Sequence, residues 1–346
     1  MLAPSGDNCQ PWRFRWDGEA LRVVFLPERA ESLYDVRFAA SWISLGAVLT
    51  NMAVASRQLG LELEVELFPS GEAARVVTRS RFRPGPAAGD PLHPAISRRC
   101  VNRRPYRAEP VPGEIRDELL AIGSSVPRVA LDWVETAFQK RRLASLAARN
   151  DRILFENRAL HDGLYRWLRW TPAEALRTRD GMPIETLELA PHERPGFRLL
   201  GSWRCARLFA ALGLTRMLPA RARRIYRRSG AMALLTVDGQ QPEDFVRGGE
   251  VLERIWLTAT LRNVAVQPIT GVTFLLLRLS MAGGEGLGPA HRRLLADVER
   301  EFLEIFPGAA GRKPAMLFRL GLGPPPSGRT LRLPLEQVLS VELSRG

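Results

Sequence analysis

Two long apolar segments, residues 41–61 and 248–264, constrain the fold of this chain most. Large apolar side chains recur at helical spacing in the first segment, and small residues between them allow a partner element to approach closely. The order Gly46-Ala47-Val48-Leu49 is matched by Gly249-Glu250-Val251-Leu252 in the second segment, and each segment leads into a strand-like stretch. This order predicts two copies of one α+β unit. Two unrelated amphipathic helices are the alternative.

Shorter predicted elements lie on both sides of these segments. The dipeptide Asp17-Gly18 predicts a hairpin turn between strands at 12–16 and 21–26. The other predicted strands are 61–68, 74–78, 129–136, 231–237 and 314–320. The other predicted helices are 113–122 and 138–169, the latter as one helix or two, and residues 171–219 are expected to be irregular because they contain several prolines and aromatic residues.

The clearest boundary in the chain is a stretch rich in proline and glycine, residues 83–94. We expect a first half of residues 1–82, this linker, and a second half of residues 95–346 with a lid-like insertion at about 140–230. Because the repeated unit combines a long helix with a strand, we expect an α+β fold.

The composition is that of a globular protein with ample core. The chain has 346 residues, of which 45% are hydrophobic and 25% charged. It contains no apolar run of the about 18 residues that a membrane span needs, and it lacks a basic-then-apolar leader pattern at its start. We therefore expect no membrane partner and a cytoplasmic location.

The formal net charge of +13 could indicate a nucleic-acid or anionic partner. Lysine occurs only at Lys140 and Lys313, so arginine has replaced lysine almost everywhere, as a genome-wide compositional bias would produce. One cluster, residues 216–228, concentrates arginine. We expect a solvated helix face or a lid there, with nucleic acid, a phosphorylated substrate and a partner protein as the alternatives.

Cysteine and histidine give no sign of a metal site. The three cysteines, Cys9, Cys100 and Cys205, are far apart, and the four histidines form no short-spaced ligand pair. The chain also lacks the G-x-S-x-G and P-loop motifs of hydrolases and NTPases.

The start of the chain, residues 3–14, combines turn formers with two carboxamides and an indole. Asn8 and Gln10 lie two positions apart, so in an extended segment they would face the same side and could read the polar edge of a heterocycle. From the residues alone, an ordinary turn before a strand is the favoured interpretation.

The pattern Ala-Pro-Ser-x-x-Asn-x-Gln-Pro-Trp in this stretch resembles the flavin-contacting loop of the nitroreductase family of FMN-dependent oxidoreductases. In that family the loop reaches across a dimer interface to an FMN held mainly by the other subunit. The resemblance implies that FMN contacts come from Pro4, Ser5, Gly6, Asn8 and Gln10.

A second stretch, Arg99-Cys100-Val101-Asn102-Arg103 followed by Tyr106 and Pro110-Val111-Pro112, resembles the opening of a nitroreductase subunit. There, two basic residues four apart hold the FMN phosphate and ribityl chain, because guanidinium groups offer forked, charge-assisted donors. The resemblance implies that Arg99, Cys100, Val101 and Arg103 contact the cofactor. Val101 departs from the family, which usually has a hydroxyl residue at this position.

Two later stretches complete the resemblance. Gln267-Pro268-Ile269-Thr270-Gly271 is similar to the Pro-Ile-Glu-Gly turn whose backbone lies against the flavin ring, with Thr270 in place of an acid. Gly328 to Pro334 is similar to a basic segment that returns to the phosphate, which implies a role for Arg332 and, as its alternative, Arg329.

The two halves lack complementary parts of this set. The first half has the Asn/Gln/Trp loop but no Arg-x-x-x-Arg, and the second half has the arginines but reads Gly123 to Arg128 where its own loop should fall. This resembles a fused subgroup of the family, including mycobacterial dormancy-linked members, in which one chain forms a pseudodimer. It implies antiparallel sheets around central helices, one FMN between the halves, and a monomer or homodimer. Aromatic residues that could be core or a lid over the flavin are Tyr165, Trp167, Trp170, Phe197, Trp203 and Phe209.

The activity implied by the resemblance is hydride transfer from NAD(P)H to FMN and then to an organic acceptor, a small-molecule substrate. Two alternatives are flavin-dependent dehydrogenation or oxidation of a biosynthetic intermediate, and an FMN-binding or sequestering protein with little turnover. The sequence names no catalytic side chain.

Overall fold

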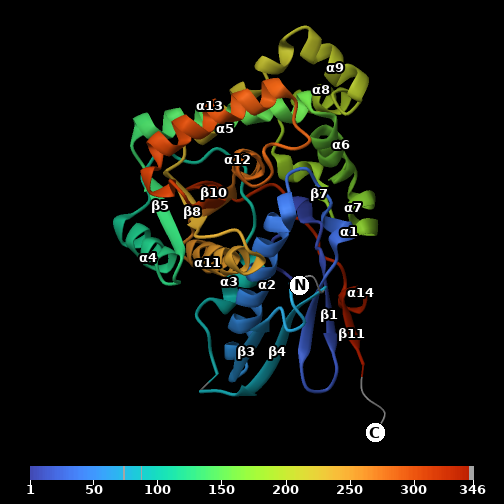
Figure 1. The fold of residues 1–346 in the computed structure, drawn as a ribbon, viewed down its shortest axis with the longest axis vertical. Helices are drawn as coiled ribbons and strands as arrows, with labels where there is room; N and C mark the ends of the chain where they lie inside the picture. Colours follow the sequence, from blue (N-terminus) through green and yellow to red (C-terminus); the bar gives the residue numbers. More distant parts are fainter. Residues whose placement is uncertain (73–74, 87, 343–346) are drawn as a thin grey trace.

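The computed structural model describes residues 1–72, 75–86 and 88–342. Two β-sheets flank a central pair of long helices, and further helices cover the second sheet (Figure 1). The expected α+β class is confirmed.

The central pair consists of α2 (Ala39–Gln58) and α11 (Pro242–Leu261), the two segments whose sequences match each other. A Cβ atom added to Gly46 would lie 1.9 Å from the carbonyl oxygen of Val246, and one added to Gly249 would lie 2.0 Å from that of Ile43. Thr50 adds a hydrogen bond from its hydroxyl to the carbonyl of Glu250, 3.0 Å. The small residues therefore allow close approach as expected, and the partner is the matching helix.

By length and composition alone, the segment Val36–Gln58 could also cross a membrane, with a mean hydropathy of 1.5 over its most apolar window. In this fold 72% of that window is buried, and its partners are α11 and the first sheet. Such burial is what a core helix shows.

The first sheet has the strand order β11-β1-β2-β4-β3. Its strands are β1 (Trp12–Trp16), β2 (Leu21–Phe25), β3 (Leu61–Leu67), β4 (Val76–Pro84) and β11 (Leu339–Val341). The expectation of antiparallel sheets is only partly right here: β1 to β4 pair antiparallel, but β11 pairs with β1 in parallel. The return of the chain to β1 near residue 340 is what makes this sheet mixed.

The second sheet has the order β5-β8-β10-β9 and is antiparallel throughout. Its strands are β5 (Val129–Val134), β8 (Ala231–Val237), β9 (Ala265–Pro268) and β10 (Lys313–Gly321). Every residue of β8 is buried, which agrees with its continuous apolar sequence.

The remaining elements are mostly helices. They are α1 (Pro27–Ala30), α3 (His93–Arg98), α4 (Gly113–Gly123), α5 (Ala137–Glu156), α6 (Arg158–Arg166), α7 (Pro172–Thr178), α8 (Glu193–Leu199), α9 (Trp203–Ala211), α10 (Pro219–Tyr226), α12 (Thr270–Ala282), α13 (Pro289–Ile305) and α14 (Leu335–Val338), with a two-stranded sheet of β6 (Leu168–Arg169) and β7 (Met182–Pro183). Of these helices, α14 packs on the first sheet and α3 on the central pair.

The expectation that residues 171–219 are irregular is wrong, because α7, α8 and α9 lie there. Pro172 and Pro195 sit in the first turns of α7 and α8, where a missing N–H costs nothing, while Pro183 lies in β7 and Pro191 precedes α8. The strand expected at 74–78 begins at Val76 in the described part of the chain and runs to Pro84. Ala74, Ala87 of the expected linker and positions 343–346 lie outside the described residues. The division into two halves stays a prediction.

Replacing Gly46 by alanine should destabilise the fold by about 3 kcal/mol or more, at the upper end of overpacking, because backbone rather than a flexible side chain occupies the space. Urea unfolding would measure this. The matched control is Gly163→Ala in α6, where nothing lies within 4 Å of an added Cβ, so helix propensity should make the change neutral or stabilising by about 1 kcal/mol. Equal effects of the two substitutions would contradict the close helix contact.

Candidate cofactor site

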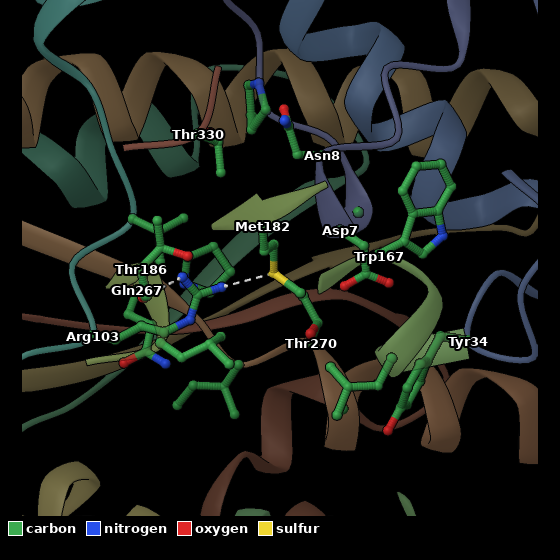
Figure 2. A pocket seen from close by; sticks show the side chains of 18 of the residues that line it. Asp7, Asn8, Tyr34, Arg103, Trp167, Met182, Thr186, Gln267, Thr270 and Thr330 are labelled. Atoms are coloured by element: carbon green, nitrogen blue, oxygen red, sulfur yellow. Dashed lines mark hydrogen bonds between the residues drawn. The ribbon is translucent and has the colours of Figure 1, made fainter. Parts of the chain in front are cut away.

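A cavity of about 1,020 Å³ lies over one end of the central helix pair and is lined by segments from the whole length of the chain. Its floor includes Ser44 and Ala47 of α2 and Leu252 and Trp256 of α11. Figure 2 shows Asp7 and Trp167 on one side of the cavity and Arg103 on the other. The helix contact therefore positions the site as well as the core.

The structure brings all but one of the sequence-predicted cofactor residues to this cavity. Those that line it are Pro4, Ser5, Gly6, Asn8, Arg99, Cys100, Val101, Arg103, Pro268, Ile269, Thr270, Gly271, Arg329 and Arg332. Gln10 is the exception: it is buried behind the loop and does not line the cavity.

The two carboxamides hold the first loop in place, and Asn8 also lines the cavity. Asn8 donates to the carbonyls of Gly181 and Leu331, both at 3.0 Å. Gln10 donates to the carbonyl of Arg179, 3.0 Å, and accepts from the backbone N–H of Leu333, 2.9 Å.

The extended geometry expected for this pair is wrong, since φ is 57° at Asn8 and 51° at Gln10. Asparagine is among the residue types that adopt positive φ most often. Both amides bond the same two distant segments, residues 179–181 and 331–333.

Arg99 reaches the cavity edge, but its charge is already matched. Its Nε lies 3.0 Å from a carboxylate oxygen of Glu253 on α11, and both side chains are almost fully buried. The guanidinium also stacks 4.7 Å above the ring of Trp256 and donates to the carbonyl of Leu2, 2.6 Å. Burial raises the pKa of Glu253, which the charge of Arg99 opposes. Arg99 therefore stabilises the fold through contacts within the protein, which its motif did not predict.

Arg103 projects into the cavity. Its guanidinium donates to the carbonyl of Thr186, 3.1 Å, and contacts the sulfur of Met182, 3.6 Å (Figure 2). Burial lowers the pKa of Arg103, and the nearby phenol and carboxyl groups, Asp7 among them, oppose that shift.

Arg329 is exposed at the edge of the cavity and donates to the carbonyl of Ser97, 2.7 Å, and to that of Arg98. Its second guanidinium nitrogen also lies 3.8 Å from the sulfur of Cys100. It fastens the segment after β10 to the segment before Arg99.

Arg332 is a cation whose hydrogen bonds all go to uncharged oxygen atoms, among them the carbonyls of Ala3, 3.2 Å, and Leu331, 3.0 Å. It donates to the side-chain oxygens of Asn8 and Thr330, both at 2.8 Å, but its Nε is buried and has no hydrogen-bond partner in the described part of the chain. Burial and then the charge of Arg99 lower the pKa of Arg332 to about 9. A buried guanidinium with these properties favours an anionic ligand.

The predicted turn at Pro268 to Gly271 joins β9 to the start of α12. Ile269 donates to the carbonyl of Leu317, 2.7 Å, and the helix then begins at Thr270. The first N–H groups of a helix have no acceptor within it, and the helix dipole makes this end positive.

Asn150 of α5 secures the first turn of α12. With its amide turned suitably, it donates to the carbonyl of Gly271, 3.3 Å, and accepts from the N–H of Val272, 3.2 Å. A Cβ at Gly271 would lie 2.2 Å from the end of this amide group, so this packing requires glycine there. Nothing in the sequence pattern pointed to Asn150.

Residues 140–230 form one wall of the cavity. Trp167, Phe197 and Phe209 line it directly. Tyr165, Trp170 and Trp203 stand behind them in a chain of ring contacts, with Tyr165 stacked on Trp170 at 6.3 Å and His161 between Tyr165 and Trp203. The aromatic residues therefore serve both as core of this segment and as cavity wall.

Asp7 is the site residue that sequence reasoning missed. It has φ of 48°, lines the cavity and points its carboxyl group toward the centre (Figure 2). Burial raises the pKa of Asp7 to about 6, and the charge of Arg103 opposes the rise. A carboxyl group with such a pKa can hold or release a proton near neutral pH.

Because the pKa of Asp7 is raised above its ordinary 3.8, the folded state favours its protonated form. That advantage is complete below pH 3.8 and is lost as the pH rises through about 6. Asp7→Asn should therefore raise the free energy of unfolding relative to the wild type by roughly 1–3 kcal/mol at pH 8 and change it little at pH 4. Urea titrations at the two pH values measure this, with the exposed Asp297→Asn as control. A gain that is the same at both values would refute the assignment.

Arg99→Met should cost about 3–5 kcal/mol, because it leaves Glu253 buried without its counter-ion. The double variant Arg99→Met/Glu253→Leu should recover most of that loss, since apolar pairs often replace buried ion pairs without penalty. Chemical denaturation of the three proteins measures both steps. A double variant as unstable as the single one would show that the ion pair is not what Arg99 contributes.

The fold and the cavity define an α+β protein with a large, cation-lined site suited to an anionic cofactor. No protein-family model matches the chain. It is 28% identical to the putative NAD(P)H nitroreductase Rv3131 of Mycobacterium tuberculosis (strain ATCC 25618 / H37Rv) over 354 aligned positions, which cover 98% of this chain and 88% of that protein. It is 29% identical over 337 residues to the uncharacterized protein MT1398 of M. tuberculosis (strain CDC 1551 / Oshkosh).

That second alignment covers 94% of this chain but only 45% of MT1398, so the chain spans about half the length of that relative. The chain is thus a distant homologue, over nearly its whole length, of the mycobacterial putative NAD(P)H nitroreductases.

Solved structures with partial overlap include an FMN-bound nitroreductase from Bacteroides fragilis, with a TM-score of 0.38 and 12% identity over 70% of this chain and 96% of that one. The nitroreductase NfnB from Mycobacterium smegmatis, in complex with NADPH, gives a TM-score of 0.38 and 17% identity over 70% and 94%. These TM-scores are too low to bear on the function of this chain.

Proposed function

We propose that this chain is an FMN-dependent oxidoreductase that takes hydride from NAD(P)H and passes electrons to an organic acceptor. One observation carries the proposal: the first loop, the 99–103 stretch, the start of α12 and the 328–332 stretch meet at one cavity. They are the four stretches whose sequences resemble flavin-binding segments. The distant homology to putative NAD(P)H nitroreductases supports the same class.

The residues present fit FMN. A phosphate would satisfy the buried Nε of Arg332, which lacks a hydrogen-bond partner among the described residues, and would offset the repulsion between Arg332 and Arg99. Arg103 is a further cation that lines the cavity. The positive end of α12 suits electron-rich atoms of a flavin ring. Trp167 and Phe197 offer aromatic surface on the opposite wall.

FMN would supply the hydride and electron chemistry, which no side chain in the described cavity can supply. The chain would orient the ring between the first loop and the start of α12 and would exclude water with the wall of residues 140–230. Asp7 is placed to hold a proton at its carboxyl group for a substrate that needs one, because its pKa of about 6 is close to working pH.

The reverse direction, dehydrogenation of a small-molecule substrate, is the second candidate, and Asp7 is the observation that favours it. A carboxylate in the cavity can accept the proton that a C–H or N–H bond releases as hydride leaves the neighbouring position. Asp7→Asn would abolish that dehydrogenation and leave the reduction of FMN by NAD(P)H largely intact.

The cofactor assignment is tested by titrating FMN into the purified protein and following quenching of flavin fluorescence. Arg103→Gln should weaken binding by roughly ten- to a hundredfold, as expected for the loss of a hydrogen bond to a charged group. The matched control is the neighbouring Arg104→Gln, because Arg104 bonds Glu188 and does not line the cavity. No FMN binding by the wild type, or equal loss in both variants, would overturn the assignment.

Turnover is tested separately by mixing the FMN-loaded protein with NADH or NADPH without oxygen. In an oxidoreductase, the bound flavin should be reduced after mixing and lose its visible absorbance. The absorbance should return when a quinone or nitroaromatic acceptor is added. A flavin that binds but never bleaches would refute the reductase and favour a sequestering protein.

A further inference from the structure

One surface of the molecule is not accounted for by the proposed function. It lies on α8, α9 and the turn that comes after α9, at the end of the molecule opposite β3 and β4 (Figure 1). Four large apolar side chains are exposed there, Leu199 at 56%, Leu208 at 59%, Leu212 at 64% and Met217 at 70%. We call this the arginine–leucine surface, because exposed arginines surround it.

The charge of this region is unusually concentrated. Residues 192–228 contain ten arginines and a single acidic residue, Glu193, so they carry nine of the thirteen net positive charges of the chain. Arg221 forms the ion pair with Glu193, and Arg198 lies over the ring of Trp170. The exposed arginines of the region are Arg194, Arg198, Arg204, Arg207, Arg216, Arg223, Arg224, Arg227 and Arg228.

The helix α9 has two distinct faces. Arg204, Leu208 and Leu212 succeed each other at intervals of four residues, so they project from the same side, and Arg207 lies beside them. The opposite side carries the fully buried Ala206. Exposed leucines bordered by arginines on one side of a helix match the pattern of helices that lie in the interface of an anionic membrane.

The arrangement discriminates between possible anionic partners. Nucleic acid would use the arginines for its phosphates but gives no partner to Leu208 and Leu212, and the site has no exposed aromatic platform for bases among its described residues. A bilayer with anionic headgroups can bind both kinds of side chain, because the guanidinium groups stay among the headgroups while the leucines enter the acyl boundary.

We propose that the arginine–leucine surface docks on the surface of an anionic lipid membrane. The contact is peripheral, because α9 is too short to span a bilayer. This proposal goes beyond the proposed function and amends the sequence-based expectation of no membrane partner. Leu199 and Met217 belong both to this surface and to the cavity lining, so docking places that side of the cavity against the membrane.

The test is co-sedimentation of the full chain with vesicles of phosphatidylcholine alone and with vesicles that contain phosphatidylglycerol. We expect binding to the anionic vesicles, little binding to the neutral ones, and weakening with added salt, since the arginine contribution is screened. FMN need not be present, so failure here is independent of failure of the cofactor assignment.

The decisive variant is Leu208→Ser/Leu212→Ser, which alters neither the cavity lining nor the net charge. It should bind anionic vesicles at least about tenfold more weakly, because the apolar insertion is lost. Arg204→Gln/Arg207→Gln should also weaken binding. The matched control, Leu59→Ser at the end of α2, removes an equally exposed leucine (72%) far from the surface and should bind as the wild type does.

Far-ultraviolet circular dichroism of all variants establishes that they fold. No binding of the wild type to phosphatidylglycerol vesicles would overturn the proposal, and so would binding that the leucine substitutions leave unchanged. Tighter binding to a DNA duplex than to vesicles at the same salt, unaffected by the leucine substitutions, would also overturn it and assign the surface to nucleic acid.

Discussion

The contact between Gly46 and Gly249 is the constraint on which the rest of the structure depends. It lets the backbones of α2 and α11 touch, because each glycine meets the neighbouring helix where a side chain would collide with a carbonyl group. The floor of the cavity consists of residues from these same two helices. A wider spacing between the two helices would move the first loop away from the turn at Pro268 to Gly271. The helix contact therefore determines the site as well as the core.

The second constraint is electrostatic and divides the arginines into two groups. Glu253, buried on α11, neutralises Arg99 and fixes it within the protein. The charge of Arg99 acts on Arg332, which forms no ion pair of its own within the described part of the chain. Arg103 also lines the cavity. Burying one acid thus leaves an excess of positive charge where an anionic cofactor would bind, which is the arrangement expected of a phosphate-binding site.

Sequence reasoning predicted the parts of the fold that are set by local pattern. The helix pair, the first hairpin and the buried strand β8 each result from periodicity or turn chemistry. The turn before α12 was predicted from the family resemblance. It failed where tertiary contacts decide: the parallel pairing of β11 with β1, the helices within 171–219, and the backbone geometry of Asn8 and Gln10. It also did not foresee the ion pair of Arg99 with Glu253. The Arg-x-x-x-Arg pattern cannot tell which arginine meets a buried acid, although Glu253 on an apolar helix face was a visible signal. Asn150 and Asp7 belong to the site only because the tertiary fold places them there, and no sequence pattern indicated this.

The central claim is that both ends of the chain and the turn before α12 bind one FMN. A crystal structure of the protein soaked or co-crystallised with FMN tests it most directly. We expect the flavin ring between residues 4–9 and residues 268–271, with the phosphate beside Arg103 or Arg332. FMN bound elsewhere on the molecule, or a cavity that stays free of FMN at saturating concentration, would contradict the claim.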